Sequence, residues 1–185
     1  MRSLILAIAI CIISPVSNAK EGSKVASARE LKMISYRGGL VYFALPAAWR
    51  EEYQPEGGGT FYDDRPGSGT LRLNVLSVSS KDVPAKQMAE TAFPKGGFEL
   101  LQDGFPLRKT VVSAEEKGHK LHLHSWEIAV PVAPHSLRIV AFRHTVLAEQ
   151  EQDPLIVQEL QFIDRSVRAA TFSQEPGLAG SHIHR

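Results

Sequence analysis

The sequence predicts an α+β fold, in which a mostly antiparallel sheet is flanked by helices. Short runs rich in β-branched and aromatic residues follow one another between residues 31 and 148, and turns containing Gly or Pro separate them. Only two segments have helical character, and the second carries an apolar stripe at helical spacing. Most connections between the strands are too short for the crossovers that parallel strands need. Together these observations predict one domain over residues 31–173.

The first half of the domain is expected to form strands joined by glycine-rich turns. Arg37-Gly38-Gly39 between two apolar runs is typical of a tight hairpin. Further turns are expected at residues 55–59 and 66–69. The run 70–79 has apolar side chains at both odd and even positions, which favours a central strand covered on both faces. Strands are expected at residues 31–36, 40–45, 49–53, 60–63 and 70–79.

The second half is expected to begin with a helix over residues 83–93, with Asp82 as its cap and Pro84 in its first turn. A meander of antiparallel strands should follow, because short turns join its strands. These strands are expected at residues 98–102, 107–114, 120–130 and 136–148.

The last helix is the best-marked element of the sequence. Asp153 is a typical cap and Pro154 suits the first helical turn. Four apolar residues then fall on one helical stripe, so this helix should pack on the sheet. They are Ile156, Leu160, Ile163 and Val167. Residues 174–185 have no apolar period and are predicted to be a disordered tail.

Residues 1–19 are predicted to be a secretory signal peptide. Arg2 gives a positive start, residues 4–13 are apolar, and Ser17-Asn18-Ala19 offers small residues to signal peptidase. The apolar run is about half as long as the roughly 20 residues that span a bilayer, so an anchor is not expected. Cleavage near Ala19 would leave a periplasmic or secreted protein with a flexible lead-in over residues 20–30.

Cleavage at that site would also change the chemistry of the chain. It removes Cys11, the single cysteine, and leaves equal numbers of basic and acidic side chains. A neutral chain without a basic block lacks the electrostatic footprint of a nucleic-acid-binding protein, so nucleic acid is not an expected partner. Stable membrane insertion after cleavage is not expected either. The absence of thiols excludes thiol catalysis and thiolate metal sites in the processed protein.

Two segments resemble the PsbP-like and DcrB-like fold family. In residues 41–49, an aromatic-rich strand ends in Leu45-Pro46 and is followed by Trp49, which is similar to the opening of that family. Residues 162–168 are similar to its closing helix. The resemblance implies an α/β/α sandwich that binds other proteins rather than catalysing reactions. It carries over no site residues, because the matched positions are structural, and fold analogy alone assigns no function.

The candidate metal ligands are His122, His124 and His144. His122 and His124 share one face of the expected strand, because side chains alternate along a strand. If the following hairpin turns near residues 133–134, His144 on the return strand approaches His124. Imidazole nitrogens are ligands for zinc or copper. The alternative is that these histidines line a half-exposed sheet face, and no cofactor is otherwise expected.

The remaining motifs favour no particular chemistry. The glycine-rich stretches at 57–60 and 67–70 lack the lysine of a phosphate loop and its strand-loop-helix setting, so we interpret both as hairpin turns. Ser68 lacks the frame of a nucleophile elbow. Asp63 and Asp64 are adjacent, so on a strand they would point to opposite faces.

These observations lead to three functional hypotheses. The first is a non-enzymatic exported accessory protein that binds another envelope or secreted protein through the sheet rim and glycine-rich turns. The second is a secreted metal-dependent hydrolase using the His119–His124 strand with Asp63 or Asp103. The third is an immunity or inhibitor protein of an exported toxin, which the sequence does not separate from the first.

Overall fold

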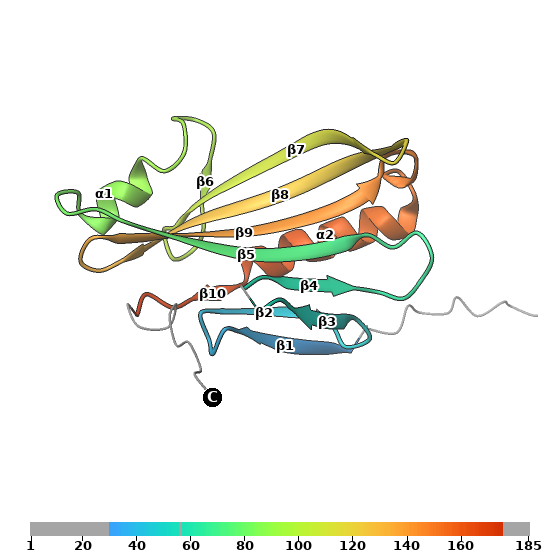
Figure 1. Ribbon diagram of the computed structural model, residues 1–185, viewed down its shortest axis with the longest axis horizontal. Helices are drawn as coiled ribbons and strands as arrows, with labels where there is room; N and C mark the ends of the chain where they lie inside the picture. Colours follow the sequence, from blue (N-terminus) through green and yellow to red (C-terminus); the bar gives the residue numbers. More distant parts are fainter. Residues whose placement is uncertain (1–29, 56, 176–185) are drawn as a thin grey trace, which may run out of the picture.

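The computed structural model describes residues 30–55 and 57–175 (Figure 1). The predicted signal peptide, the lead-in up to residue 29 and the predicted tail from residue 176 lie outside the described residues. No helix within the described ranges is long and apolar enough to cross a membrane.

Two antiparallel sheets make up most of the molecule. The three-stranded sheet has the order β1-β2-β10, and the seven-stranded sheet has the order β3-β4-β5-β9-β8-β7-β6. The predicted α+β class with a mostly antiparallel sheet is confirmed. The strands are β1 (Leu31–Tyr36), β2 (Val41–Pro46), β3 (Arg50–Tyr53), β4 (Gly59–Tyr62), β5 (Thr70–Ser79), β6 (Glu99–Leu100), β7 (Pro106–Glu116), β8 (His119–Val132), β9 (Ser136–Leu147) and β10 (Thr171–Phe172).

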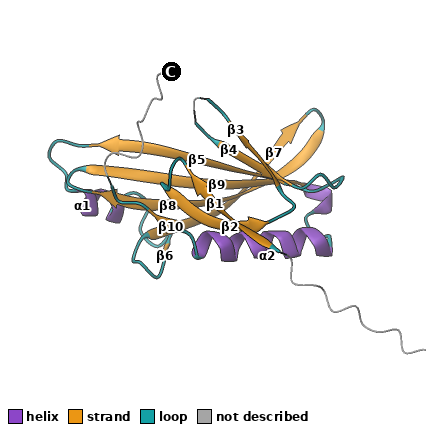
Figure 2. Ribbon diagram, turned by 90° about the horizontal axis from the view of Figure 1, so that it is seen from below, coloured by secondary structure: helices purple, strands orange, loops and turns teal. Residues whose placement is uncertain are grey.

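The main core lies between one face of the large sheet and a second layer made by the small sheet and helix α2 (Pro154–Arg168). Figure 1 shows the small sheet below the long strands, and Figure 2 shows α2 running along them. Phe43 of β2 meets Phe142 of β9 and Phe61 of β4 edge to face, at ring-centroid distances of 5.1 and 5.4 Å. Such pairs add to the stabilisation from burial itself.

Helix α1 (Ala85–Glu90) packs on the opposite face of the large sheet, over one end of β8 and β9. Its Ala89 joins a second, smaller core with Ala129 and Leu137. Helices therefore lie on both faces of the large sheet, as the predicted layered arrangement requires.

Two local predictions around α1 and β5 are wrong. Asp82 does not cap α1, because the preceding turn is organised by Ser80, whose hydroxyl accepts from the backbone N–H groups of Asp82 and Val83. Residues 70–79 are not covered on both faces either. Leu76 and Val78 are 63% and 43% exposed, because α1 packs against β8 and β9 and leaves this part of the outer face open.

Helix α2 follows its prediction closely. Asp153 accepts a hydrogen bond from the N–H of Leu155 at 2.8 Å, and Pro154 occupies the first turn. Ile156, Ile163 and Val167 are buried in the interface with the sheets. The helix begins beside the short 3-10 helix η1 (Ala148–Gln150), which directly follows β9.

Candidate functional site

Three histidines of the large sheet face helix α2. His122 and His124 lie two positions apart on β8, and His144 of β9 stands directly opposite His124 in the antiparallel register. The predicted approach of His144 to His124 is thus confirmed. His144 is fully buried and stacks on Trp49, and His124 stacks on Trp126, with ring-centroid distances of 6.3 and 6.5 Å.

A single carboxylate joins two of these histidines. Glu151, which follows η1, accepts a hydrogen bond from His122 Nδ1 at 2.8 Å. Its other oxygen lies 2.8 Å from His124 Nε2, although this contact is out of line for a hydrogen bond. The Glu151 carboxylate therefore ties the segment between β9 and α2 to strand β8.

The surroundings of His124 and Glu151 shift the pKa of both side chains. Burial lowers the pKa of His124 below its usual value, although Glu151 partly opposes this shift. Burial raises the pKa of Glu151, but the hydrogen bond from His122 and the charges of both histidines outweigh it, so the net pKa is lowered. The folded state thus favours a neutral His124 and an ionised Glu151.

We expect the free energy of unfolding to fall when the pH is lowered from about 7 to about 4. The unfolded chain takes up a proton at His124 below about pH 6.5 and one at Glu151 below about pH 4.5, before the folded state does. Urea unfolding at several pH values measures this. In Glu151→Gln the free energy of unfolding should change less steeply with pH between about pH 5 and pH 3.5. Stability that rises towards acid would contradict the assignment.

The three-histidine metal site remains a prediction. Within residues 30–55 and 57–175, no group of three or more His, Cys, Asp or Glu side chains has the arrangement that holds a metal ion. Glu151 already contacts His122 and His124, so an ion would have to displace this carboxylate or take it as a ligand.

The metal hypothesis predicts stoichiometric binding of zinc or copper that is lost in the double variant His122→Ala with His124→Ala. Isothermal calorimetry on the wild type and this variant is the measurement. A wild-type titration without heat of binding removes the hypothesis, and so does binding that the double variant retains.

The third histidine belongs to a separate buried cluster. His144 Nε2 lies 3.0 Å from Oε1 of Glu159, a residue of α2 that is only 2% exposed. The other oxygen of Glu159 lies 3.6 Å from the guanidinium of Arg65, which Asp63 holds in turn at 2.7 Å. Glu159 therefore connects the sheet, the helix and the turn that joins β4 to β5.

Gly69 allows this cluster to form. A Cβ atom at this position would overlap the His144 ring and would lie 2.7 Å from the carbonyl oxygen of Thr145. Only glycine lets the turn between β4 and β5 approach the histidine so closely. The second glycine-rich stretch thus sits against a buried ionisable pair.

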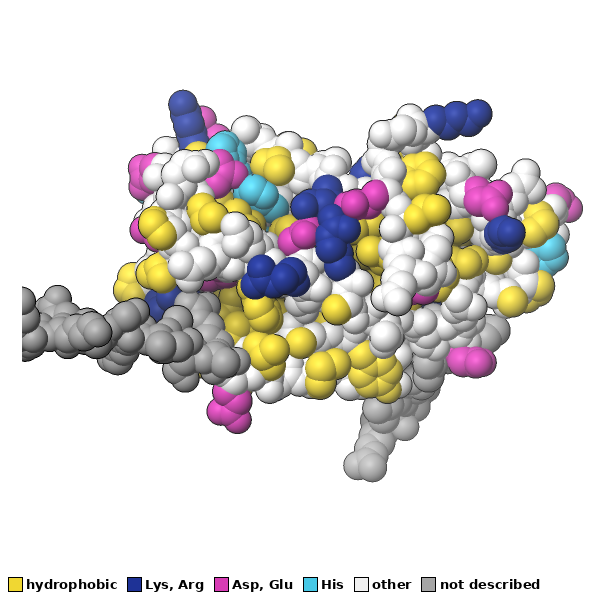
Figure 3. All heavy atoms as spheres, turned by 180° about the vertical axis from the view of Figure 1, so that it is seen from behind, with side chains coloured by type: hydrophobic (Ala, Val, Ile, Leu, Met, Phe, Trp, Pro, Cys, Tyr) yellow, Lys and Arg dark blue, Asp and Glu magenta, His cyan; other side chains and the backbone are white. Residues whose placement is uncertain are grey.

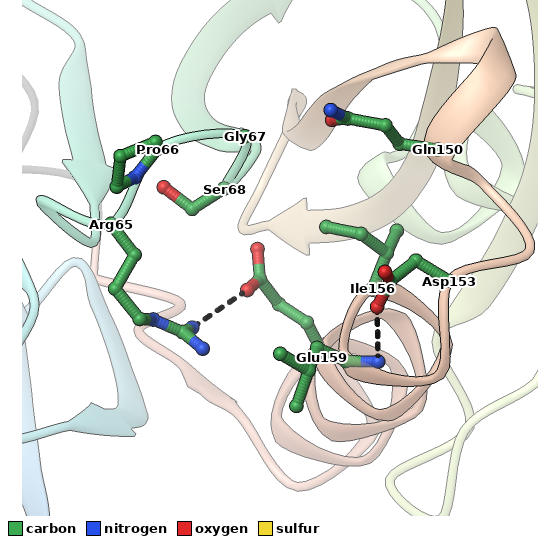
Figure 4. A pocket seen from close by; sticks show the side chains of 9 residues that line it. Arg65, Pro66, Gly67, Ser68, Gln150, Asp153, Ile156 and Glu159 are labelled. Atoms are coloured by element: carbon green, nitrogen blue, oxygen red, sulfur yellow. Dashed lines mark hydrogen bonds and ion pairs between the residues drawn. The ribbon is translucent and has the colours of Figure 1, made fainter.

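A pocket of about 170 Å³ opens above Glu159. Figure 4 shows the turn from Arg65 to Ser68 on one side and helix α2 on the other, with Gln150 completing the rim. Glu159 points between these walls towards Arg65. Oε1 of Glu159 and Oε1 of Gln150 are buried, and neither accepts a hydrogen bond from any other described residue. Oε1 of Glu159 has His144 Nε2 as its neighbour at 3.0 Å, but this contact does not have the geometry of a hydrogen bond.

The pocket does not have the geometry of a serine hydrolase. In a Ser-His-acid triad the acid contacts one ring nitrogen and the serine the other. Here Glu159 contacts Nε2 of His144, while Nδ1 is buried with no hydrogen-bond partner in the described part of the chain. The Ser68 hydroxyl donates instead to the carbonyl oxygen of Asp63 at 2.6 Å.

The acids proposed for a metal-dependent hydrolase lie apart from the His119–His124 strand or are already paired. Asp63 accepts two hydrogen bonds from Arg65. Asp103 lies before β7 and accepts from the N–H of Phe105, whereas His122 pairs with Ser113 towards the other end of β7. The strand rise of about 3.3 Å per residue separates these positions by roughly 20 Å.

Sequence reasoning missed Arg65, Glu151 and Glu159. Glu159 lies between Ile156 and Leu160 on the buried side of α2. An acidic residue within an apolar helical stripe is a signal that could have pointed to it, because an ionised group is rarely buried without partners. Glu151 and Arg65 lie outside regular helices and strands, and no periodicity marks them.

A second ionic cluster holds the other end of α2. Asp164 accepts hydrogen bonds from Trp126 Nε1 and Arg168 Nε, each at 2.8 Å, and pairs with Lys109 at 2.7 Å. Arg168 also reaches Glu99. Figure 3, which views the molecule from behind Figure 1, shows Lys and Arg side chains gathered near the middle, with Asp and Glu side chains beside them. Because its members are paired, we assign this cluster to stability.

The sequence matches no family model and no curated protein. Among solved structures, the chain is similar to a protein from Bacteroides thetaiotaomicron, with a TM-score of 0.51 and 14% identity over 77% of this chain. The matched part is 48% of the Bacteroides protein, so the chain spans about half of that protein's length.

It is also similar to LpqN, which is involved in cell envelope biogenesis in Mycobacterium tuberculosis. The TM-score is 0.51 and the identity 14%, over 78% of this chain and 91% of LpqN. The cyanobacterial PsbP (CyanoP) of Synechocystis sp. PCC 6803 matches with a TM-score of 0.35 and 11% identity, over 80% of this chain and 96% of that protein. The matches to the Bacteroides protein and to LpqN agree with an α+β fold of this kind. At these identities the likeness is one of fold alone.

Proposed function

We propose that this chain is a non-enzymatic accessory protein that is exported and binds another envelope protein through the pocket above Glu159. The observation that carries the proposal is the carboxyl group of Glu159, which lies almost wholly buried beside this pocket, between His144 and Arg65. A hydrogen bond to a charged group contributes about 1.5–3 kcal/mol, so a ligand that donates a hydrogen bond to this carboxylate gains up to that much.

The charge of the pocket favours a cationic donor. Glu159 and Asp153 line it with carboxyl groups, and Arg65, already held by Asp63, is the one basic side chain that the described residues contribute to its wall. A volume of about 170 Å³ accommodates a slender group such as the end of a lysine side chain. A basic side chain on the surface of a partner protein meets both requirements.

Three further points support the proposal. The pocket lies at the second glycine-rich turn. From the sequence we expected a partner to bind through the sheet rim and the glycine-rich turns. The contacts of His144 and Ser68 differ from those of a hydrolytic triad. The fold is like that of LpqN, which is involved in cell envelope biogenesis, and residues 1–19 have the pattern of an export signal.

Site-specific photo-crosslinking in cells that express the full chain tests the proposal. The crosslinker replaces Leu155, an exposed residue on the rim of the pocket. Lys86, exposed on α1 on the far face of the sheet, is the matched control position. We expect one envelope protein to be captured repeatedly from position 155 and not from position 86.

The same capture in the Glu159→Gln background gives the decisive comparison. Because the substitution removes the charge but keeps the shape, we expect capture to fall at least tenfold while the protein remains folded. Equal capture from both positions, or capture that Glu159→Gln leaves unchanged, would refute the proposal. If the captured protein is an exported toxin, the inhibitor hypothesis gains. Hydrolase activity with added zinc would instead favour the metal-dependent hydrolase.

A further inference from the structure

Strand β7 forms a long open edge of the large sheet. Its neighbour β6 pairs only with Pro106 and Leu107, so residues 108–116 have no strand on their outer side among the described residues. Figure 1 shows β7 along the upper border of the sheet, with β6 beside only one end of it. Within the described part of the chain, the outward-pointing backbone N–H and C=O groups of these nine residues have no strand partner, so they can pair with another chain.

This edge lacks the usual protection against such pairing. Val111 and Val112, at its centre, are 58% and 55% exposed. Residues 108–116 contain no proline, and their register with β8 runs without a bulge from Leu107 to Glu116. Native sheets usually place charge, proline or a bulge at the middle of an exposed edge. Here the charges stand only at the two ends.

The charges are arranged so that the edge complements itself. Arg108 and Lys109 lie at one end, and Glu115 and Glu116 at the other. In an antiparallel pair of identical strands related by a two-fold axis through Val112, the basic end of each copy meets the acidic end of the other. Lys109 then stands opposite Glu115 of the second copy, and Arg108 opposite its Glu116. Within one copy Lys109 already pairs with Asp164 and Arg108 with Glu127, so the two acids of the second copy would join existing ion pairs.

The side-chain faces agree with this register. A two-fold axis perpendicular to the sheet keeps each face on its own side, so opposite residues must both be odd or both be even. Lys109 and Glu115 share the face that carries α2, whereas Arg108, Val112 and Glu116 share the other face. Opposite charges directly across a strand pair stabilise it.

We propose that two copies of this chain associate through β7, which joins their large sheets into one continuous antiparallel sheet with Val112 on the two-fold axis. The open part of β5 serves as a comparison. Residues 74–79 also extend beyond their neighbour β4, but they carry no charged side chain and so no self-complementary pattern. Of these two open edges the observations favour β7, and this association is independent of the pocket above Glu159.

Disulfide trapping in the full chain tests the register. In a Cys11→Ser background no other thiol is present. Val112→Cys should form a covalent dimer rapidly with a mild oxidant such as diamide, because residues facing each other across antiparallel strands have the Cα separation that a disulfide requires. Leu76→Cys, which is similarly exposed on β5, is the matched control. Equal trapping in the two variants, or none in Val112→Cys, would overturn the proposal.

Sedimentation analysis of the protein without added thiols tests the charge pattern. The wild type should show a concentration-dependent dimer. In the double variant Glu115→Lys with Glu116→Lys, the dissociation constant of the dimer should rise at least tenfold. The variant Asp82→Lys with Glu90→Lys changes the net charge equally at exposed sites near α1 and should leave the dimer intact. A wild type that stays monomeric, or equal losses in both variants, would contradict pairing through β7.

Discussion

Replacing Gly69 with alanine should lower the free energy of unfolding by about 3 kcal/mol. The added methyl group would overlap the ring of His144 and would lie too close to the backbone oxygen of Thr145. The His144 side chain cannot move away from the added methyl group, because it is fully buried between Trp49 and Glu159. Urea unfolding followed by circular dichroism measures the change.

Gly97→Ala is the matched control for this experiment. Its added Cβ would meet only the carbonyl oxygen of Pro94, at 3.3 Å, and a more distant atom of the same residue. We expect a change in the free energy of unfolding of less than about 1 kcal/mol there. If both alanine variants were equally stable, Gly69 would not be holding the turn against His144, and the floor of the pocket would be arranged differently.

Replacing Asp164 with alanine should have a similarly large effect, about 3 kcal/mol on the free energy of unfolding. The carboxylate joins α2 to β8 through Trp126 and to β7 through Lys109. Trp126 is 2% exposed, so its indole N–H would lose its partner inside the protein. Thermal or urea unfolding of the variant beside wild type measures the loss.

The pH dependence distinguishes the role of Asp164 from simple packing. Burial alone raises its pKa, but hydrogen bonds from Lys109, Arg168 and Trp126 outweigh it and place the pKa at about 2. A lowered pKa contributes stability above about pH 4 that is lost as the pH falls towards 2. Wild type should lose this contribution over that range and Asp164→Ala should not. Glu90→Ala, at an exposed acid of α1, should behave like wild type.

The helix α2 and the long hairpin of β8 and β9 could be predicted because their signals are local. Asp153, Pro154 and the apolar stripe mark α2, and the turn near residue 134 sets the register that brings His124 opposite His144. In both cases neighbouring residues along the chain carry the whole signal.

The burial of β5 and the partners of the histidines could not be predicted in this way. Whether Leu76 is covered depends on where α1 packs, which no pattern within residues 70–79 contains. Glu151 and Glu159 meet their histidines only after the segment that follows β9 has folded back along the sheet. These contacts arise from tertiary packing, so no spacing of residues along a single sequence predicts them.

The central claim is that the pocket above Glu159 receives a cationic donor group, and an NMR titration of the labelled protein with N-acetyl-lysine methylamide tests it most directly. We predict saturable shifts of the backbone amide signals of Ser68, Gln150 and Ile156, which line the pocket, and their loss in Glu159→Gln. N-acetyl-alanine methylamide, which lacks the ammonium group, should cause none. Shifts that are absent, spread over the whole surface, or unchanged in Glu159→Gln would contradict the claim.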